Sequence, residues 1–273
     1  MCKFGKKIPP EQTCLEKVSG GIPMRLPTQT SFRFGKLPPK IDYRTISFGN
    51  YLKDDIPNPP SCTNHIERVS TELQHPPEYL FPMYSNDSLG DCTIAGMAHG
   101  VTVYNGMVKE EHIPSEKEVV RIYFHLTGGI DSGLYMLDVV KFWRATGIEN
   151  HRVYAYASVS SHNHEHVMQA IWLFGGVFIG FQCQEKVVEE FRARKPWQPG
   201  IKLNAGHAVF VTGYSRDEVE VLTWGTTQKG TWAWWDEHVD EAYVLLPPEA
   251  SQEGFTPGFD FERLKKDLEE VAR

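Results

Sequence analysis

The stretch NDSLGDC at residues 86–92 leads directly into the apolar run CTIAGMAHGVTVYNG at residues 92–106. Turn-forming residues that give way to a long apolar run predict a helix, which we expect from Cys92 to about Tyr104. The unpaired N–H groups and the dipole at a helix start favour negative charge, so they lower the pKa of a thiol there. Cys92 is therefore a candidate nucleophile. The alternative is a small buried residue at the top of a core helix.

A thiol nucleophile needs a base, and His207 has a suitable setting. It lies in NAGHAVFVTGY at residues 204–214, where a turn precedes it and an apolar strand follows it. We expect the imidazole at the first residue of this strand, which is a rigid platform for a general base. His99 lies two helical turns beyond Cys92, too far along the helix to touch the thiol, and we assign it to the core.

The order of the elements predicts an α+β fold. Helical patterns at 115–126, 134–146 and 164–174 come first. β-branched and aromatic runs follow: VFIGFQC (177–183), HAVFVTGY (207–214), EVEVLTW (218–224), GTWAWW (230–235) and EAYVLL (241–246). Helices first and strands later favour a helical lobe beside an antiparallel sheet lobe.

The chain divides into three parts. Residues 1–75, rich in Pro and Gly, are expected to form an extended segment, residues 76–248 a catalytic-type domain, and residues 249–273 a C-terminal amphipathic helix packed on the body. The apolar stripe of that helix comprises Phe261, Leu264, Leu268 and Val271. Residues 1–60 are expected to lie across the body, and they would be inhibitory if they crossed its cleft.

Three pieces of sequence, taken in order, resemble the papain-like cysteine peptidase superfamily. They are N-x5-C on a loop that enters a helix, G-H-A-V at the opening of a strand, and W-G-T after the next strand. The stretch DSGLYMLDVVKFWRATGI (131–148) is similar to that family's glycine-lined cleft wall and the helix after it. The resemblance covers roughly residues 80–246. It implies a papain-like fold with the active cleft between a helical lobe and an antiparallel β-sheet lobe.

The resemblance also implies roles for individual residues. Cys92 matches the nucleophile and His207 the general base. Asn86 stands where the family has an oxyanion-hole amide, beside the backbone N–H of Cys92; the alternative for Asn86 is an Asx-turn. Trp224 matches a tryptophan that shields the base from water, and Gly133 matches a glycine whose backbone binds extended substrate.

One position departs from the family pattern. The family places an orienting Asn two residues before that tryptophan, whereas this chain has Leu222, which cannot accept a hydrogen bond. We expect Thr223 or a backbone carbonyl to accept the second N–H of His207, although the strand register must then bring Thr223 to the correct face. Gln228 is a further polar candidate near the site, and a simple Cys–His dyad is the remaining alternative.

The expected function is that of a cysteine-dependent hydrolase or acyl transferase, acting on an amide, peptide or related acyl bond through a Cys92 acyl-enzyme. Two alternatives stay open. One is a non-catalytic papain-like binding or structural protein, which Leu222 favours. The other is a Cys-dependent ligase or cyclase in a biosynthetic pathway, because an acyl-thioester can be captured by an internal nucleophile.

Composition limits the partners. The chain has 273 residues and a net charge of −7, which disfavours nucleic acid as a partner. No stretch approaches the roughly 18 apolar residues that span a membrane. Its five cysteines are widely spaced, without a CxxC pair, so we expect no disulfide framework, no metal, no cofactor and a cytoplasmic location. The expected partner is a peptide, protein or other acyl substrate.

Two further motifs have competing interpretations. His162, His164 and His166 alternate and could ligate a metal if extended, but a polar turn at a helix start is the favoured interpretation. Trp232, Trp234 and Trp235 could stack on a base or a sugar. Alternating aromatic residues in a strand are more often part of the core.

Overall fold

The computed structural model describes residues 32–248 and 258–271 of the chain. Its strands are β1 (Thr63–Asn64), β2 (Ala155–Ser158), β3 (Val177–Gln184), β4 (Lys202–Tyr214), β5 (Glu218–Thr223), β6 (Thr226–Thr231) and β7 (Val239–Leu246). Its helices are η1 (Phe48–Tyr51), α1 (His65–Leu73), α2 (Pro77–Leu80), α3 (Cys92–Met107), α4 (Glu116–Leu126), α5 (Met136–Ala145), α6 (His164–Phe174), α7 (Val187–Arg192), α8 (Trp232–His238) and α9 (Phe261–Val271).

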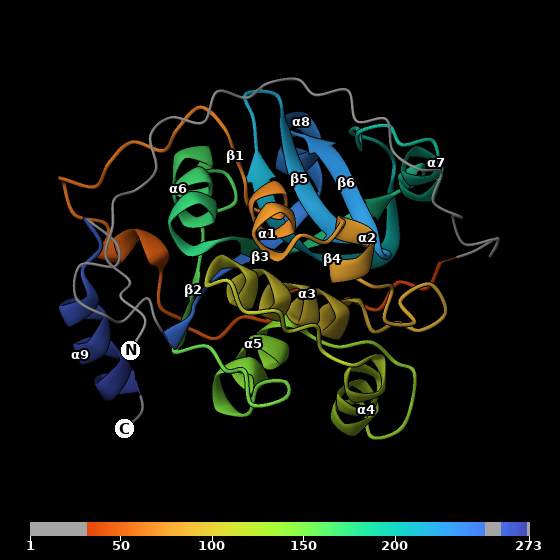
Figure 1. Ribbon diagram of the computed structural model, residues 1–273, viewed down its shortest axis with the longest axis horizontal. Helices are drawn as coiled ribbons and strands as arrows, with labels where there is room; N and C mark the ends of the chain where they lie inside the picture. Colours follow the sequence, from red (N-terminus) through yellow and green to blue (C-terminus); the bar gives the residue numbers. More distant parts are fainter. Residues whose placement is uncertain (1–31, 249–257, 272–273) are drawn as a thin grey trace.

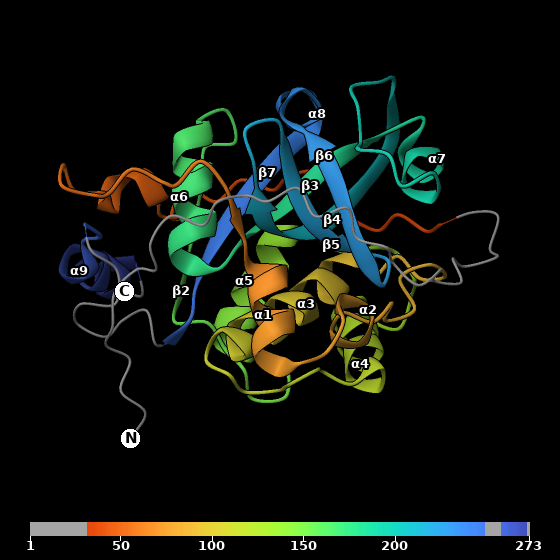
Figure 2. The same ribbon diagram turned by 45° about the horizontal axis from the view of Figure 1, so that its top comes forward.

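The strands of the described residues form one sheet of seven strands in the order β2-β7-β3-β4-β5-β6, with β1 added to β4. All of its strand pairs are antiparallel. Helices α3, α4 and α5 lie together on one side of the sheet, below the strands in Figure 1, and α3 and α4 stay below the strands in the turned view of Figure 2. The predicted α+β architecture, with a helical lobe and an antiparallel sheet lobe, is confirmed.

Helix α3 joins the two lobes because it is apolar around nearly its whole circumference. Its residues are almost all buried, as expected for a helix with core on every side. Gly100 lets the helix approach its neighbours closely, since an added Cβ would lie 2.5 Å from the Trp143 ring. The side of the sheet that faces α3 contributes Ala208 and Phe210 to this core, whereas Val209 and Val211 belong to the core on the other side.

Two predicted elements differ from the structure. Strand β4 begins at Lys202, so His207 lies inside the strand rather than at its first residue. The aromatic run expected as a strand is helix α8, which Thr231 caps by accepting a hydrogen bond from the backbone N–H of Trp234. Trp234 and Trp235 are buried. An aromatic pair at adjacent positions suits a short helix as well as a strand, so periodicity alone could not separate them.

The N-terminal part combines irregular chain with one helix. The described residues 32–61 contain one helical turn, η1. Isolated β-bridges link this stretch to the rest of the protein. Helix α1 follows, within the span that the sequence suggested was extended, and Ile66 and Val69 bury against the helical core. Residues 1–31 lie outside the described residues.

The C-terminal helix α9 packs on the irregular N-terminal stretch. Leu264 and Leu268 are buried in the core, and the Tyr51 hydroxyl donates a hydrogen bond to Asp267 at 2.8 Å. The side chain of Val271 lies outside the described residues, as do residues 249–257. None of the helices in the described chain has both the length and the apolar content to cross a membrane.

The cysteines differ from expectation at one position. Cys62 is disulfide-bonded, whereas Cys92 and Cys183 are free. Widely spaced cysteines reveal no pairing in a sequence because folding brings the partners together. The cytoplasmic location was predicted from cysteine usage and stays a prediction. A disulfide is unusual in a reducing compartment and so argues against it.

Candidate active site

Cys92 is the first residue of α3 and is 1% exposed. Burial raises the pKa of its thiol to about 11, while hydrogen bonds from the backbones of Gly35 and Ala208 act in the opposite direction. The thiol is therefore neutral in this structure. The hydrogen bond from Ala208 also places the sulfur beside the residue that follows His207 in β4.

His207 is completely buried and is held from two sides. Its Nε2 atom lies 2.7 Å from Thr223 Oγ1, and the Trp224 ring stacks on the imidazole with centroids 4.6 Å apart and planes 23° apart. Burial lowers the pKa of His207 to about 3. The Nδ1 atom has no hydrogen-bond partner among the described residues, so the expected contact of about 3–4 Å with the thiol stays a prediction.

The faces of β5 explain why Thr223, and not Leu222, meets the imidazole. Leu222 pairs with Phe210 and shares the core beneath α3 with it. Because side chains alternate along a strand, Thr223 lies on the opposite face, which is also the face of His207. Trp224 follows with a left-handed backbone, φ 48°, and so turns back over the ring.

Asn86 and Asp91 form a buried polar pair beside the helix start. The Asn86 amide donates a hydrogen bond to Asp91 Oδ1 at 3.0 Å. Asp91 is fully buried, and its Oδ2 atom has no partner among the described residues. Burial raises the pKa of this carboxyl to about 8. One N–H of Asn86 is thus engaged with Asp91, and the oxyanion role of Asn86 stays a prediction. The sequence indicated Asp91 as a turn or cap-like residue before Cys92; it is the N-cap of α3, but its side chain makes no capping hydrogen bond.

Gly133 lies against the segment that covers the site, whereas the Gln228 side chain is hydrogen-bonded to other parts of the chain. Gly133 has a φ of 77°, and an added Cβ there would lie 2.3 Å from the carbonyl oxygen of Gly35. Gly133 therefore borders a chain segment that crosses the site, as a substrate-binding glycine would. The Gln228 amide instead donates to the carbonyls of Lys195 and Lys229, and in the described chain it forms no hydrogen bond with His207.

Residues 32–37, here called the strap, cover the thiol and the imidazole. The strap is the red segment of Figure 1: Phe32 contacts Phe191 of α7, and Lys36 bridges to Leu134, shortly before α5. Its Gly35 carbonyl accepts a hydrogen bond from the Leu134 N–H at 2.8 Å, and the Lys36 N–H donates to the Gly206 carbonyl at 3.0 Å. The Phe34 ring lies edge-on to His207, with centroids 5.9 Å apart. Substrate cannot reach the thiol while the strap is in place.

The strap fits the site at one glycine in particular. An added Cβ at Gly35 would lie 1.7 Å from the carbonyl oxygen of Gly90, two residues before Cys92. Further along, Phe32 packs on Trp224 with ring centroids 4.4 Å apart, and Arg33 pairs with Asp131 at 2.8 Å. Pro and Gly density indicated an extended segment, but nothing local indicated these partners.

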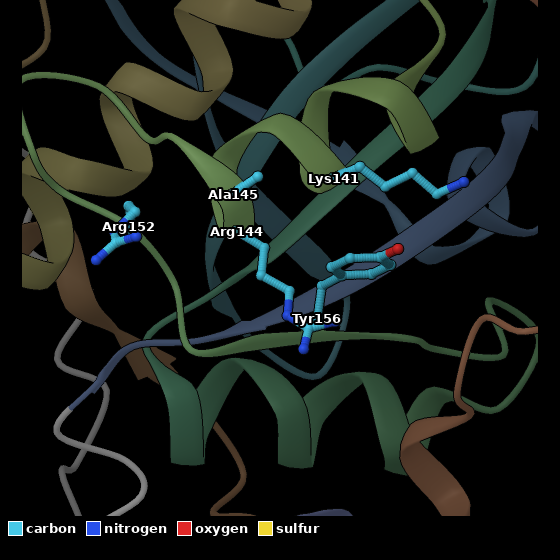
Figure 3. A pocket seen from close by; sticks show the side chains of 5 residues that line it. All are labelled: Lys141, Arg144, Ala145, Arg152 and Tyr156. Atoms are coloured by element: carbon cyan, nitrogen blue, oxygen red, sulfur yellow. The ribbon is translucent and has the colours of Figure 1, made fainter. Parts of the chain in front are cut away.

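A pocket with a polar lining lies away from this site. A pocket of about 340 Å³ lies between α5 and β2, lined by Lys141, Arg144, Ala145, Arg152 and Tyr156 (Figure 3). It contains none of the predicted site residues, and Lys141 already pairs with Asp42 at 2.8 Å.

The histidine motif does not form a cluster. His164 begins α6, where residues two apart no longer share a face, and its ring pairs with Asp236 at 2.6 Å. In the residues that the structure describes, no group of three His, Cys, Asp or Glu side chains could hold a metal ion.

Comparison with solved structures places the fold. Xylellain, a cysteine protease from Xylella fastidiosa, is 16% identical, with a TM-score of 0.62 over 82% of this chain and 99% of that chain. The proCathepsin B S9 of Trypanosoma congolense is 10% identical, with a TM-score of 0.58 over 78% of this chain and 86% of that chain. The cysteine protease CMS1MS2 of Carica candamarcensis is 13% identical, with a TM-score of 0.50 over 69% of this chain and 99% of that chain.

No protein-family model and no curated protein sequence matches the chain. Likeness at identities this low establishes the fold alone. The papain-like fold that the three sequence pieces predicted is confirmed.

Proposed function

We propose that this protein is a cysteine-dependent hydrolase of peptide or related amide bonds, with Cys92 as nucleophile and His207 as base. One observation carries the proposal: Thr223 fixes the imidazole of His207 by a hydrogen bond at Nε2, and Trp224 fixes it by stacking on the ring face. The fixed ring leaves Nδ1 without a partner, in the strand that also hydrogen-bonds the Cys92 sulfur. A positioned base with one uncommitted nitrogen is what thiol activation needs.

The proposed reaction follows from these positions. Nε2 carries a proton that Thr223 Oγ1 accepts, so Nδ1 can take the proton of the Cys92 thiol. The sulfur attacks the carbonyl carbon, and the resulting oxyanion accepts hydrogen bonds from the backbone N–H of Cys92 and from Asn86. The leaving amine takes the proton from His207, and water then cleaves the thioester. Capture of the thioester by another nucleophile would make the same site an acyl transferase, or a ligase or cyclase.

The strap makes the described form a latent one. Both pKa shifts, upward for Cys92 and downward for His207, have burial as their main cause. Displacement of residues 32–37 would admit water and substrate and so reduce the penalty on both charged forms. The thiolate–imidazolium pair is proposed for that open form.

A non-catalytic scaffold is the second candidate, and a specific observation favours it. The described thiol and imidazole are both buried and neutral, and no hydrogen bond joins them in the described chain. In a scaffold this arrangement would be permanent, and the strap would be an ordinary part of the core.

Intact-mass spectrometry with a peptide p-nitrophenyl ester separates the two candidates. A hydrolase accumulates an acyl adduct on Cys92 or turns the ester over, and Cys92→Ala abolishes both. Cys183→Ala is the matched control, because Cys183 is also a free buried thiol. Absence of adduct and turnover, in a protein whose strap has been shown to open, would establish the scaffold.

A further inference from the structure

Lys36 of the strap is a buried lysine beside the proposed active site. Its side chain is 1% exposed, and a buried ammonium needs anionic partners to offset its desolvation. The Nζ atom lies 2.5 and 2.6 Å from the two carboxylate oxygens of Asp240 and 3.3 Å from Glu241 Oε1. Two carboxylates thus face one cation.

The acidic pair is positioned by β7. Asp240 and Glu241 are consecutive near its start, and Glu241 pairs with Gly180 of β3. The Tyr243 hydroxyl donates to Glu241 Oε2 at 3.2 Å and so orients this carboxylate. The Glu241 side chain is 7% exposed, and Oε1 has no hydrogen-bond partner in the described chain. The Oε1 atom of Glu241 faces the ammonium group of Lys36.

Two glycines make room for the lysine stem. An added Cβ at Gly180 would lie 2.4 Å from Lys36 Cε, and one at Gly206 would lie 2.9 Å from Lys36 Cδ. Met136 borders the same space, since its sulfur would lie 2.6 Å from the Gly180 Cβ. The lysine site, defined as Gly180, Gly206, Asp240 and Glu241, is therefore a narrow space, here called the channel, that the lysine stem fills and that has acidic groups at its end.

The lysine site adjoins the reaction centre. Gly206 precedes His207 in β4, and Lys36 follows Gly35, whose backbone hydrogen-bonds the Cys92 sulfur. When the strap moves away, Lys36 leaves with it. The channel and its two carboxylates would then be open to a substrate, beside the residue that precedes His207 in β4.

We propose that the lysine site selects substrates carrying a cationic side chain, Lys or Arg, next to the residue at the Cys92 thiol. This inference rests on the proposed function for its catalytic consequence. The strap lysine occupies the site in the latent form, and a substrate cation replaces it in the open form. An aliphatic side chain would fill the channel but leave both carboxylates unpaired, which is the basis of discrimination.

The first test needs no catalysis. Lys36→Ala empties the lysine site in the full chain, and Gly35→Ala in the same chain displaces the strap. Calorimetry then measures the binding of this protein to two peptide amides, acetyl-Lys-Gly-amide and acetyl-norleucine-Gly-amide, together with the reversed-order pair. Norleucine matches the lysine stem without its ammonium. The expected result is at least roughly tenfold tighter binding of one lysine peptide than of its norleucine partner. Equal affinities in both pairs would overturn the proposal.

Variants of the acidic pair complete the binding test. Asp240→Asn combined with Glu241→Gln, in the background of Gly35→Ala and Lys36→Ala, should remove the preference for lysine. Glu237→Gln is the matched control, since this half-exposed carboxylate lies on α8 and outside the lysine site. A preference that survives the double variant, or that is lost in the control, would also overturn the proposal.

The second test applies if Lys36→Ala fails to fold. In the Gly35→Ala protein, whose strap is displaced, it measures the ratio of kcat/KM for lysine and norleucine peptide coumarin amides with the wild-type acidic pair and with the double variant. The ratio should exceed roughly tenfold in the former and approach one in the latter; a ratio near one in both contradicts the proposal. Absence of turnover for every peptide in that open protein, with calorimetric binding of the lysine peptide retained, would refute the hydrolase and leave the cation site standing.

Discussion

His207 Nε2 lies 2.7 Å from the hydroxyl of Thr223, whose side chain is on the face of β5 opposite to Leu222. A hydroxyl thus occupies the orienting position that an amide holds in the papain-like pattern. It fixes the ring less firmly, because a hydroxyl rotates freely about its C–O bond. Stacking of Trp224 on the imidazole adds a second restraint.

Thr223→Val should lower kcat by about three- to tenfold with little change in KM, because the ring loses its orienting partner. Thr223→Ser should restore most of the loss, since it keeps the hydroxyl. Steady-state kinetics of the three proteins provide the check. Full turnover in Thr223→Val would show that another group orients the ring.

Leu222→Ala should act on stability instead. Leu222 is buried beneath α3, so the variant should lower the free energy of unfolding by about 2–4 kcal/mol. Its kcat, measured at a temperature where the protein is folded, should stay near that of the wild type. Chemical denaturation and kinetics on the same sample test both statements. A selective loss of kcat would place Leu222 in the site.

Gly35→Ala should open the latent form. An added Cβ at this position would overlap the Gly90 carbonyl oxygen, so the strap must shift away from the thiol. The rate of Cys92 alkylation should rise by about tenfold or more, equivalent to about 1.4 kcal/mol of lost strap contact.

Gly200→Ala is the matched control for the strap, because its Cβ would lie 3.3 Å from Gln184 Cβ, a tight contact that a small shift relieves. Its alkylation rate should equal that of the wild type. An unchanged rate in a folded Gly35→Ala protein would mean that the strap does not limit access to the thiol.

Asp91→Asn should make stability less dependent on pH. Burial raises the pKa of Asp91 to about 8 in the folded chain, above its unfolded value of about 3.9. Between these values the folded state binds a proton that the unfolded state has lost, so wild-type stability falls as pH rises from about 4 to 8. Asn removes this contribution.

The difference in unfolding free energy between Asp91→Asn and wild type should therefore grow in favour of the variant across that pH range. We expect it to reach about 1 kcal/mol or more at pH 7. Urea denaturation at several pH values measures it. A constant difference would show that Asp91 is ionised in the folded protein throughout.

Local patterns predicted the parts of the site that depend on local structure. The turn before Cys92 and the apolar run after it specified the start of α3. Strand alternation gave Thr223 and Leu222 opposite faces, so the orienting hydroxyl was among the predicted candidates. The hydrogen bond from the Gln228 amide to the Lys195 carbonyl could not be predicted, because only the folded chain brings these residues together.

Long-range packing hid the rest. The strap reaches the site through Gly35 against Gly90 and Lys36 against the start of β7, contacts between segments far apart in the sequence. Nothing in the local sequence distinguishes Lys36 from other lysines near a proline. The burial of Asp91 likewise depends on the surrounding fold, because the pattern N-D-S-L-G-D is equally typical of a solvent-exposed turn.

Cys92 is proposed to become an imidazole-activated thiolate when the strap opens. The most direct measurement is the pH dependence of Cys92 alkylation by iodoacetamide, followed by intact mass, in Gly35→Ala and in Gly35→Ala with His207→Gln. A rapid alkylation rate is expected already at about pH 6, well below the ordinary thiol pKa of about 8.5, and His207→Gln should abolish it. Alkylation that rises only above about pH 8, and is the same in both proteins, would contradict the proposal.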